Sequence, residues 1–468
     1  MSKFPKDFLW GASTSGYQFE GGWDKDGKGM SVQDVHKDNW MPGVPSFHDG
    51  SNHYNNWKED VALMAEMGFK SYRFSIQWSR IIPDGDGDIN QKGLEFYEGL
   101  ILELKKFKIE PVVTLYHFDL PLALAKDGGW LNRRTIDAFE KYSRTVFNEF
   151  KSIVKYWLTI NEQNVVVLAG AMLGMGSTGK SKNPAKDMWQ VNHNLLTAQA
   201  RAIIACREIC PDTSKIGPAP NIGSTYQNSN KPEDYYARLR FDLIRNWTYL
   251  DVPVFGTYNK LFLKDLEKTN AMFEYTPEDM KQLANSKPDF IAFNYYQTTT
   301  IENPIEGKDY GKMHRDQHSG FSTKFFAQVK NENLPKTEFG WEIDPIGFKN
   351  TLREVFDRYQ LPLMITENGI GANDKLTSDN KVHDEYRIKY YQQHIEQMSL
   401  AIDDGVEMIG YMPWSAIDLL STHEGITKRY GFIYVNRDEF DLKDMARYKK
   451  DSFFWYQKMI KSNGEKLD

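Results

Sequence analysis

The sequence predicts an α/β fold, a single (β/α)8 TIM barrel with extended βα loops that spans residues 1–468. Three observations lead to this prediction. Eight short apolar runs rich in β-forming residues alternate with amphipathic stretches along most of the chain. The 468 residues fall within the length that such barrels reach with insertions. The first run is not followed by the Gly-x-Gly-x-x-Gly motif that is typical of an open dinucleotide-binding sheet.

The eight predicted strands end near Ser13, Gln77, His117, Asn161, Pro220, Tyr295, Glu367 and Trp414. Apolar residues that recur three and four positions apart predict helices between them, most clearly over 57–67, 93–107, 134–150, 189–209 and 385–404. Two connections are long, at 222–288 and 298–361. Connections of this length usually carry function or small elements of their own. No linker or internal repeat divides the chain, so we expect one domain.

The composition excludes several classes of protein. A net charge of −6 argues against a general nucleic-acid binder, which needs a basic surface. No apolar run is long enough to span a membrane, and the first residues lack the apolar core of a signal peptide, so we expect a cytoplasmic protein. Cys206 and Cys210 have neither the spacing of a disulfide scaffold nor partners for a zinc site. The oligomeric state stays open, with a homodimer among the alternatives.

Two glutamates carry most of the functional information. Glu162 lies in the segment 159–163 (TINEQ) and Glu367 in 365–369 (ITENG), and each follows a predicted strand. The carboxyl ends of the strands of a parallel barrel converge on one face, so the two carboxylates are expected to meet there. Two facing carboxylates are the minimal machinery for cleaving a glycosidic bond.

Other polar or aromatic side chains are predicted at the same end of the barrel: Gln18, Glu20, Arg73, His117, Asp119, Asn161, Asn294, Tyr296 and Trp414. Each alone is compatible with a structural role, and a histidine after a strand is more often a hydrogen-bonded core residue. A metal-dependent hydrolase would need converging His and Asp ligands, for which His117 is too little, so we expect neither metal nor cofactor. A non-catalytic carbohydrate-binding barrel is expected to lack one carboxylate, and both are present.

Several segments together, in this order, resemble glycoside hydrolase family 1 over nearly the whole chain. They are 8–13 (FLWGAS), 18–21 (QFEG), 73–76 (RFSI), 78–80 (WSR), 116–121 (YHFDLP), 161–162 (NE), 293–296 (FNYY), 366–369 (TENG) and 430–432 (YGF). The resemblance implies a (β/α)8 barrel and hydrolysis of β-glycosides with retention of configuration.

The resemblance also implies catalytic roles, with Glu367 as nucleophile and Glu162 as general acid/base. The carboxyl groups of a retaining pair lie ~5–5.5 Å apart. Glu367 is expected to be ionised at rest, favoured by Arg73 and Tyr296 at matching family positions. Glu162 is expected to be protonated at rest and to become the base for water once the charge of Glu367 has been consumed.

Further positions match substrate contacts of the family. Gln18, His117, Asn161 and Asn294 correspond to residues that hydrogen-bond sugar hydroxyls, Asn161 to the one at the 2-hydroxyl, and Tyr296 is expected to contact the substrate as well as Glu367. Trp414 would form the platform under the sugar ring, and Trp341 would stack on the aglycone. The chain departs from many family members after Glu162, where Gln163-Asn164 replaces a proline, as in the phosphoglycoside branch.

The segment after the eighth strand predicts the substrate. Where family members that act on plain sugars carry a Glu-Trp pair, this chain has Ser421-Thr422, and the spacing from Ser421 to Lys428 and Tyr430 resembles the phosphate-binding signature of 6-phospho-β-glycosidases. A glutamate at 421 would repel a 6-phosphate, whereas serine, lysine and tyrosine supply a hydroxyl, a cation and a further donor.

These residues predict a 6-phospho-β-glucosidase that releases glucose 6-phosphate from substrates such as cellobiose 6-phosphate or aryl β-glucoside 6-phosphates. A 6-phospho-β-galactosidase and a dual-specificity enzyme are the alternatives. Thr422 favours the gluco form, because galactosidases of this branch usually carry tryptophan there.

Overall fold

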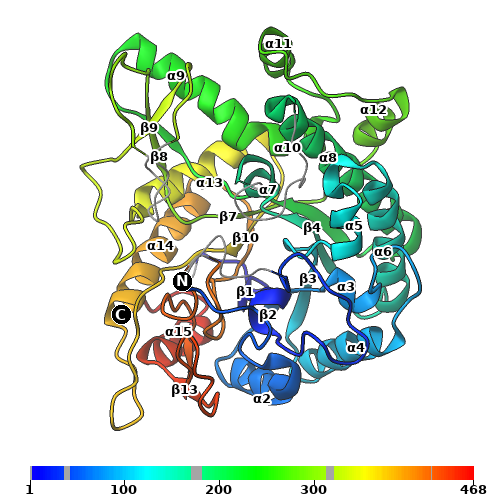
Figure 1. Ribbon diagram of the computed structural model, residues 1–468. Helices are drawn as coiled ribbons and strands as arrows, with labels where there is room; N and C mark the ends of the chain where they lie inside the picture. Colours follow the sequence, from blue (N-terminus) through cyan, green and yellow to red (C-terminus); the bar gives the residue numbers. More distant parts are fainter. Residues whose placement is uncertain (1–2, 36–42, 170–181, 312–320, 423, 468) are drawn as a thin grey trace.

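The computed structural model describes residues 3–35, 43–169, 182–311, 321–422 and 424–467, and its strands form a central barrel surrounded by helices (Figure 1). The barrel strands are β1 (Leu9–Ser13), β2 (Ser71–Ser75), β3 (Glu110–Tyr116), β4 (Tyr156–Asn161), β5 (Lys215–Ala219), β7 (Ile291–Asn294), β10 (Leu363–Glu367) and β11 (Met408–Tyr411). They follow the spatial order β5-β4-β3-β2-β1-β11-β10-β7, with parallel pairing throughout.

The barrel closes between β5 and β7. The backbone N–H of Asn294 donates to the carbonyl of Pro220, and the N–H of Ile222 donates to the carbonyl of Asn294, each at 2.9 Å. The predicted (β/α)8 barrel is therefore confirmed. Each observed strand ends within three residues of its predicted end, and the largest difference is at β11, which ends at Tyr411 rather than Trp414. Trp414 still forms an isolated parallel bridge with Ser13.

Long helices cover the outside of the barrel (Figure 1): α2 (His53–Glu66), α4 (Gln91–Lys106), α6 (Arg134–Phe150), α8 (Pro184–Ile209), α13 (Pro345–Tyr359), α14 (Glu385–Asp403) and α15 (Asp451–Lys461). Five of them match predicted helices. Shorter helices occupy the connections: α1 (Gly16–Phe19), α3 (Trp78–Ile81), α5 (Leu122–Lys126), η1 (Gly129–Leu131) and α7 (Gln163–Ala169). In α6, buried Phe139, Tyr142 and Val146 recur at helical spacing and form the face that packs inward.

The two long connections contain regular structure of their own. The first holds β6 (Thr225–Gln227), α9 (Pro232–Asp242), the π-helix η2 (Leu243–Trp247), α10 (Thr248–Phe255), α11 (Lys260–Lys268) and α12 (Pro277–Ala284). The second holds β8 (Thr299–Glu302), β9 (Ala327–Val329) and α13. Strands β6, β8 and β9 pair into a small separate sheet, which packs through Phe241, Ile301 and Phe326. In the described part of the chain, no helix is both long and apolar enough to cross a membrane.

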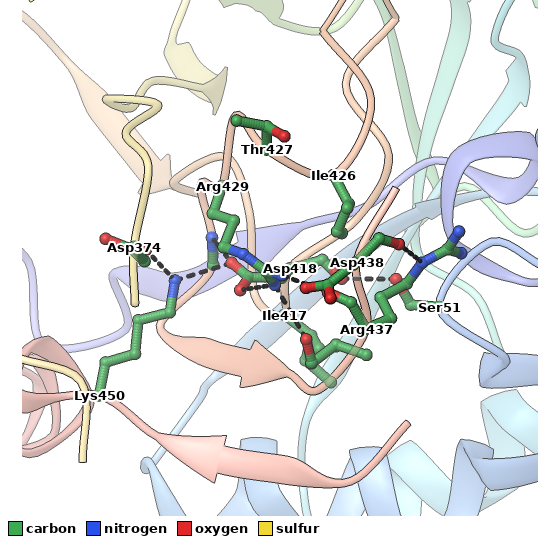
Figure 2. Close-up of polar contacts among 12 residues, drawn as sticks. Ser51, Asp374, Ile417, Asp418, Ile426, Thr427, Arg429, Arg437, Asp438 and Lys450 are labelled. Atoms are coloured by element: carbon green, nitrogen blue, oxygen red, sulfur yellow. Dashed lines mark hydrogen bonds and ion pairs between the residues drawn. The ribbon is translucent and has the colours of Figure 1, made fainter. Parts of the chain in front are cut away.

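A buried charged network joins the segment that follows β11 to neighbouring parts of the chain, and Figure 2 shows Asp374, Asp418, Arg429 and Lys450 from it. It consists of Asp374, Asp384, Arg387, Asp418, Arg429 and Lys450, whose side chains are at most 4% exposed. Lys450 Nζ lies between the carboxylates of Asp374 and Asp418, at 2.7 Å from Asp418 Oδ1.

This charged network fixes the backbone on both sides of Tyr430. Arg387 donates to the carbonyl of Arg429 at 3.0 Å, and the N–H of Gly431 donates to Asp418 at 2.9 Å. The antiparallel pair β12 (Ile433–Val435) and β13 (Arg447–Lys449) then leads to Lys450 at the start of α15. The last segment of the chain is thereby tied to the loops after β10 and β11.

We expect Lys450→Met to destabilise the protein by about 3–5 kcal/mol, because it leaves two buried carboxylates without the cation that they share. The free energy of unfolding from urea denaturation measures this. Lys449→Met is the matched control: Lys449 pairs with Glu66 at a partly exposed site, so its loss should cost less than about 1 kcal/mol. Equal losses for the two variants would contradict the assigned role of the network.

Candidate active site

The closed barrel brings both glutamates to its carboxyl-terminal face. Glu367 is the last residue of β10, and Glu162 directly follows β4 with a φ of +43°. A left-handed backbone at a residue other than glycine costs free energy and is found preferentially at functional sites. Hydrogen bonds connect the two side chains through Arg73 on β2, Asn161 on β4 and Asn294 on β7.

Arg73 is fully buried at the centre of this site. Its Nη1 donates to Glu367 Oε1 at 2.6 Å, its Nη2 to Asn161 Oδ1 at 2.7 Å, and its Nε to Thr114 Oγ1 at 2.8 Å. Tyr296 donates from its hydroxyl to the other oxygen of Glu367 at 2.7 Å. Both carboxylate oxygens of Glu367 therefore accept a hydrogen bond, as the sequence led us to expect.

Burial nevertheless has the largest effect on Glu367 and raises its pKa to about 7. The positive charge of Arg73 and the hydrogen bond from Tyr296 oppose this rise, whereas the nearby charge of Glu162 adds to it. The expected contacts are present, but they do not hold the pKa of this carboxyl at a low value. Glu367 is thus a group that titrates near neutral pH.

Asn294 connects the two glutamates. Its Nδ2 lies 3.0 Å from Glu162 Oε1 and 3.1 Å from Asn161 Oδ1, and its Oδ1 accepts a hydrogen bond from the Thr366 hydroxyl at 2.8 Å. Because Asn161 Oδ1 accepts from Arg73, it must be the amide oxygen, so Asn294 presents its N–H groups to Asn161 and Glu162. Thr366, although part of the TENG segment, was not predicted as a site residue.

His117 is held as a neutral imidazole, because burial and the charge of Arg73 lower its pKa well below its ordinary value. The oxygen of Asn161 already accepts from Arg73 and Asn294, so Asn161 Nδ2 donates to His117 Nε2, at 3.1 Å. The proton then resides on Nδ1, which is buried and has no hydrogen-bond partner among the described residues. A bound hydroxyl group would satisfy this donor.

Trp414 and Gln18, two further predicted sugar contacts, are held by different kinds of interaction. The Trp414 ring is stacked on the His117 ring, with centroids 6.0 Å apart. Gln18, on α1, is almost fully committed to protein contacts: its Nε2 donates to the carbonyl of Leu420 at 2.7 Å, and its Oε1 accepts from Ser15 at 2.6 Å. Gln18 thus joins the first βα loop to the segment after β11.

The segment after β11 places Lys428 against two aromatic rings. Its Nζ lies 3.6 Å from the ring centroid of Trp341 and 4.7 Å from that of Phe339. Trp341 in turn meets Tyr296 edge to face, with centroids 5.3 Å apart. Burial lowers the pKa of Lys428 to about 7, against the opposing charge of Glu424.

Ser421 and Tyr430 are both buried in the same segment. The N–H of Ser421 donates to the carbonyl of Gly425, and in the described part of the chain no hydrogen bond joins Ser421 to Lys428 or Tyr430. The predicted phosphate-binding residues share a segment, but only Lys428 and Tyr430 are seen in mutual contact, with the ammonium 5.6 Å from the ring centroid.

Gly371, in the loop after β10, makes this packing sterically possible and was not predicted. A Cβ atom there would lie 2.6 Å from Lys428 Cγ and 2.9 Å from Tyr430 Cζ. Sequence reasoning also missed Asn221, which donates to Glu162 at 2.8 Å. Asn221 follows the predicted strand end at Pro220, so the rule that identified the other strand-end residues could have found it. Within the described ranges, no group of three or more His, Cys, Asp or Glu is arranged to hold a metal ion.

The fold and the site define a class of parallel barrel proteins in which glutamates at the ends of the fourth and seventh barrel strands share one hydrogen-bond network. Residues 1–465 match the family model described as glycosyl hydrolase family 1. The chain belongs to glycosyl hydrolase family 1.

Similar proteins include both phosphoglucosidases and a plain glucosidase. The aryl-phospho-β-D-glucosidase BglC of Bacillus subtilis (strain 168) is 46% identical over 99% of this chain and 98% of its own length. A 6-phospho-β-glucosidase of Clostridium longisporum is 41% identical over the same shares. The solved structure of a family 1 β-glucosidase from Thermotoga maritima, 37% identical, superposes with a TM-score of 0.89 and covers 99% of both chains.

Proposed function

We propose that the protein hydrolyses 6-phospho-β-D-glucosides with retention, and releases glucose 6-phosphate and the aglycone. The main observation that supports this proposal is the environment of Lys428. It is buried, it lies beside the aromatic residues of the site, and no carboxylate of the described residues forms an ion pair with it. A buried cation that no carboxylate contacts directly is costly, and a ligand phosphate would relieve that cost.

The substrate of this chain cannot be read from its fold, because the β-glucosidase from Thermotoga maritima has the same fold. The two phosphoglucosidases with greater identity support a phosphorylated substrate. In the proposed complex the 6-phosphate is held by Ser421, Lys428 and Tyr430.

The proposed reaction has two steps. Glu367 attacks the anomeric carbon while Glu162 transfers its proton to the leaving oxygen, and the aglycone departs as an alcohol. Glu162, now ionised, then removes a proton from water, which attacks the anomeric carbon and releases Glu367. Arg73 and Tyr296 orient the nucleophile and stabilise its charged form.

The remaining site residues would bind the sugar and the aglycone. His117 offers its free Nδ1 donor, and the amides of Asn161 and Asn294 belong to the same hydrogen-bond network. Gln18 is proposed as a further sugar contact from its matching position in the family. Trp414 would lie under the ring and Trp341 beside the aglycone. Thr422, whose hydroxyl lies 3.1 Å from that of Tyr17, leaves more room than a tryptophan would and favours the gluco form.

A 6-phosphorylated substrate carries charge that keeps it from crossing a membrane unaided, which is consistent with action in the cytoplasm. The cytoplasmic location, the homodimer and the single domain stay predictions.

We expect Glu367→Gln to lower kcat by on the order of 10⁴-fold or more, because an amide cannot form the glycosyl ester. Release of 4-nitrophenol from 4-nitrophenyl β-glucoside 6-phosphate measures it. Glu396→Gln, an exposed change on α14, is the control and should keep normal activity. Nearly full activity of Glu367→Gln would rule out this nucleophile.

The pH dependence should follow the nucleophile. Because Glu367 must be ionised to attack and its pKa is about 7, kcat/KM should fall as the pH decreases below this value, which gives the acidic limb of the profile. Tyr296→Phe removes a hydrogen bond that lowers this pKa, so the acidic limb should move to higher pH. The substrate phosphate titrates near 6 with both the wild type and Tyr296→Phe. The difference in the acidic limb between the two enzymes is therefore due to the pKa of Glu367. An unchanged limb would count against this assignment.

Lys428→Ala should lower kcat/KM about 10- to 100-fold on 4-nitrophenyl β-glucoside 6-phosphate and have little effect on the unphosphorylated glucoside, because a charge-assisted hydrogen bond to phosphate is lost. Lys375→Ala, an exposed change in the loop after β10, is the control. Equal losses on the two substrates would argue against a phosphate site.

A Lys428→Arg variant tests whether the charge of residue 428 controls binding of the phosphorylated substrate. The pKa of Lys428 is about 7, so in the wild type the lysine is charged below this pH and KM for the phosphorylated substrate should rise above it. Arginine stays charged, so KM of the variant should not show this alkaline rise.

A further inference from the structure

A cluster of polar residues is hydrogen-bonded to one carboxyl oxygen of Glu162. Glu162 Oε1 accepts two amide hydrogen bonds, from Asn221 Nδ2 at 2.8 Å and from Asn294 Nδ2 at 3.0 Å. No hydrogen bond to Glu162 Oε2 is formed by any of the described residues. An oxygen that accepts from two N–H groups does not also carry the proton of the neutral acid, so the proton resides on Oε2.

Asn221 is fixed in the orientation that this arrangement requires. Its Oδ1 accepts from Arg245 Nη2 at 2.7 Å. Arginine has donors but no acceptor, so the amide of Asn221 must present its oxygen to Arg245 and its N–H₂ to Glu162. A flipped amide would place an N–H₂ against the guanidinium and an oxygen against the carboxyl group.

The backbone of Asn221 is held by the same neighbours. Its carbonyl accepts from Arg245 Nη1 and from Asn164 Nδ2, both at 2.6 Å, and its N–H donates to Asn164 Oδ1 at 3.0 Å. Asn164 Nδ2 also donates to the carbonyl of Arg245 at 3.0 Å, which closes the cluster. Asn164 belongs to the Gln163-Asn164 pair at which this sequence departs from many family members.

Arg245 reaches the site from the π-helix η2, which interrupts the helical path between α9 and α10. Such wide turns occur frequently at functional sites. Among the described residues no carboxylate forms an ion pair with Arg245. Its strongest favourable charge interaction is with Glu162, while burial lowers its pKa from the ordinary arginine value. A positive charge therefore lies behind Asn221 and is directed toward the acid/base.

We infer that Arg245 is a positioning residue for the acid/base step: through Asn221 it keeps the proton of Glu162 on Oε2, where it can be given to the leaving oxygen. This inference rests on the proposed function. In the first step the Oε2–H bond breaks and a new O–H bond forms on the departing alcohol, as the bond between Glu367 and the anomeric carbon forms and the glycosidic bond breaks. The carboxylate left on Glu162 is stabilised by the Asn221 amide, with the charge of Arg245 behind it.

Leaving groups of different acidity test this role. A dinitrophenolate departs without being protonated, whereas a phenolate needs a proton from the general acid. Loss of general-acid catalysis therefore lowers kcat/KM mainly on the phenyl substrate. For Arg245→Met we expect kcat/KM to fall about 100-fold on phenyl β-glucoside 6-phosphate and to stay within about threefold on the 2,4-dinitrophenyl substrate. The ratio kcat/KM reports the first step alone, so the second step does not mask the difference.

Three further variants complete the test. Asn221→Ala should show the same selectivity, and the double variant should be no worse than Asn221→Ala, because Arg245 acts through Asn221. Arg245→Lys keeps a charged donor and should recover part of the loss. Arg240→Met, on α9 and paired with Asp265 at 3.0 Å, is the matched control and should affect both substrates equally.

Equal losses on both substrates, or additive losses in the double variant, would overturn the inference and leave Arg245 a structural residue. If Arg245→Met does not fold, Asn221→Ala and Arg245→Lys still decide the question. Failure of the proposed function is distinguishable, since the wild type would then cleave neither phosphorylated glucoside. In that case, phenyl and 2,4-dinitrophenyl β-glucosides without the phosphate would test whether Arg245 positions the proton of Glu162.

Discussion

The buried guanidinium of Arg73 is the interaction on which the site depends. Removing a guanidinium from water is costly, and it is tolerated only where acceptors surround the group. Here Thr114, Asn161 and Glu367 supply them from three different strands. That arrangement requires a closed barrel, because only closure places the ends of β2, β3, β4 and β10 around one point. One further contact follows from it: once Asn161 accepts from Arg73, its amide must donate to His117, which leaves the buried Nδ1 proton as a free donor.

The two glutamates differ in how they interact with arginine: Glu367 contacts one directly, and Glu162 is linked to another through an amide. Arg73 touches Glu367 directly, but burial is strong enough to raise the pKa of this carboxyl to about 7 in spite of it. Glu162 accepts hydrogen bonds from two neutral amides, and the charge of Arg245 lies beyond one of them. In the proposed mechanism this difference suits the two roles. A nucleophile needs a direct counter-charge for an anion that is present at the start, whereas a proton donor needs a polarised neutral environment until the proton has left.

The sequence predicted those parts of the site that lie directly at strand ends. Asn161, Glu162, Asn294 and Glu367 follow from short apolar runs and the polar residues that end them, because barrel geometry brings such positions together. Arg73 lies within β2, and its role was predicted from the family resemblance. Helix α13 was not predicted, although Phe348, Leu352 and Val355 recur at helical spacing, because it lies within a connection that also contains two short strands. Arg245 and Gly371 were not predictable in this way. Arg245 lies 81 residues from Asn164 and has no local signal, and Gly371 matters only through the two side chains that pack against it. The pKa of Glu367 was beyond sequence reasoning as well, since it depends on whether burial or the neighbouring charges have the larger effect.

The proposed phosphate-binding residues lie on a different segment of the chain from the catalytic network. The catalytic residues lie on barrel strands or directly after them, and a β-glucosidase with a TM-score of 0.89 has the same fold. The proposed phosphate residues lie on the segment after β11, and the buried charged network anchors the backbone of that segment on both sides of Tyr430. Lys428, next to this anchored stretch, lies against the ring of Trp341. The two ends of the proposed substrate, phosphate and aglycone, would thus meet one lysine–tryptophan pair. A phosphate that draws the ammonium toward itself would weaken its contact with the indole and so change the surface offered to the aglycone. In the proposed complex, recognition of the two ends would therefore be coupled through Lys428, while the barrel holds the two carboxylates in place.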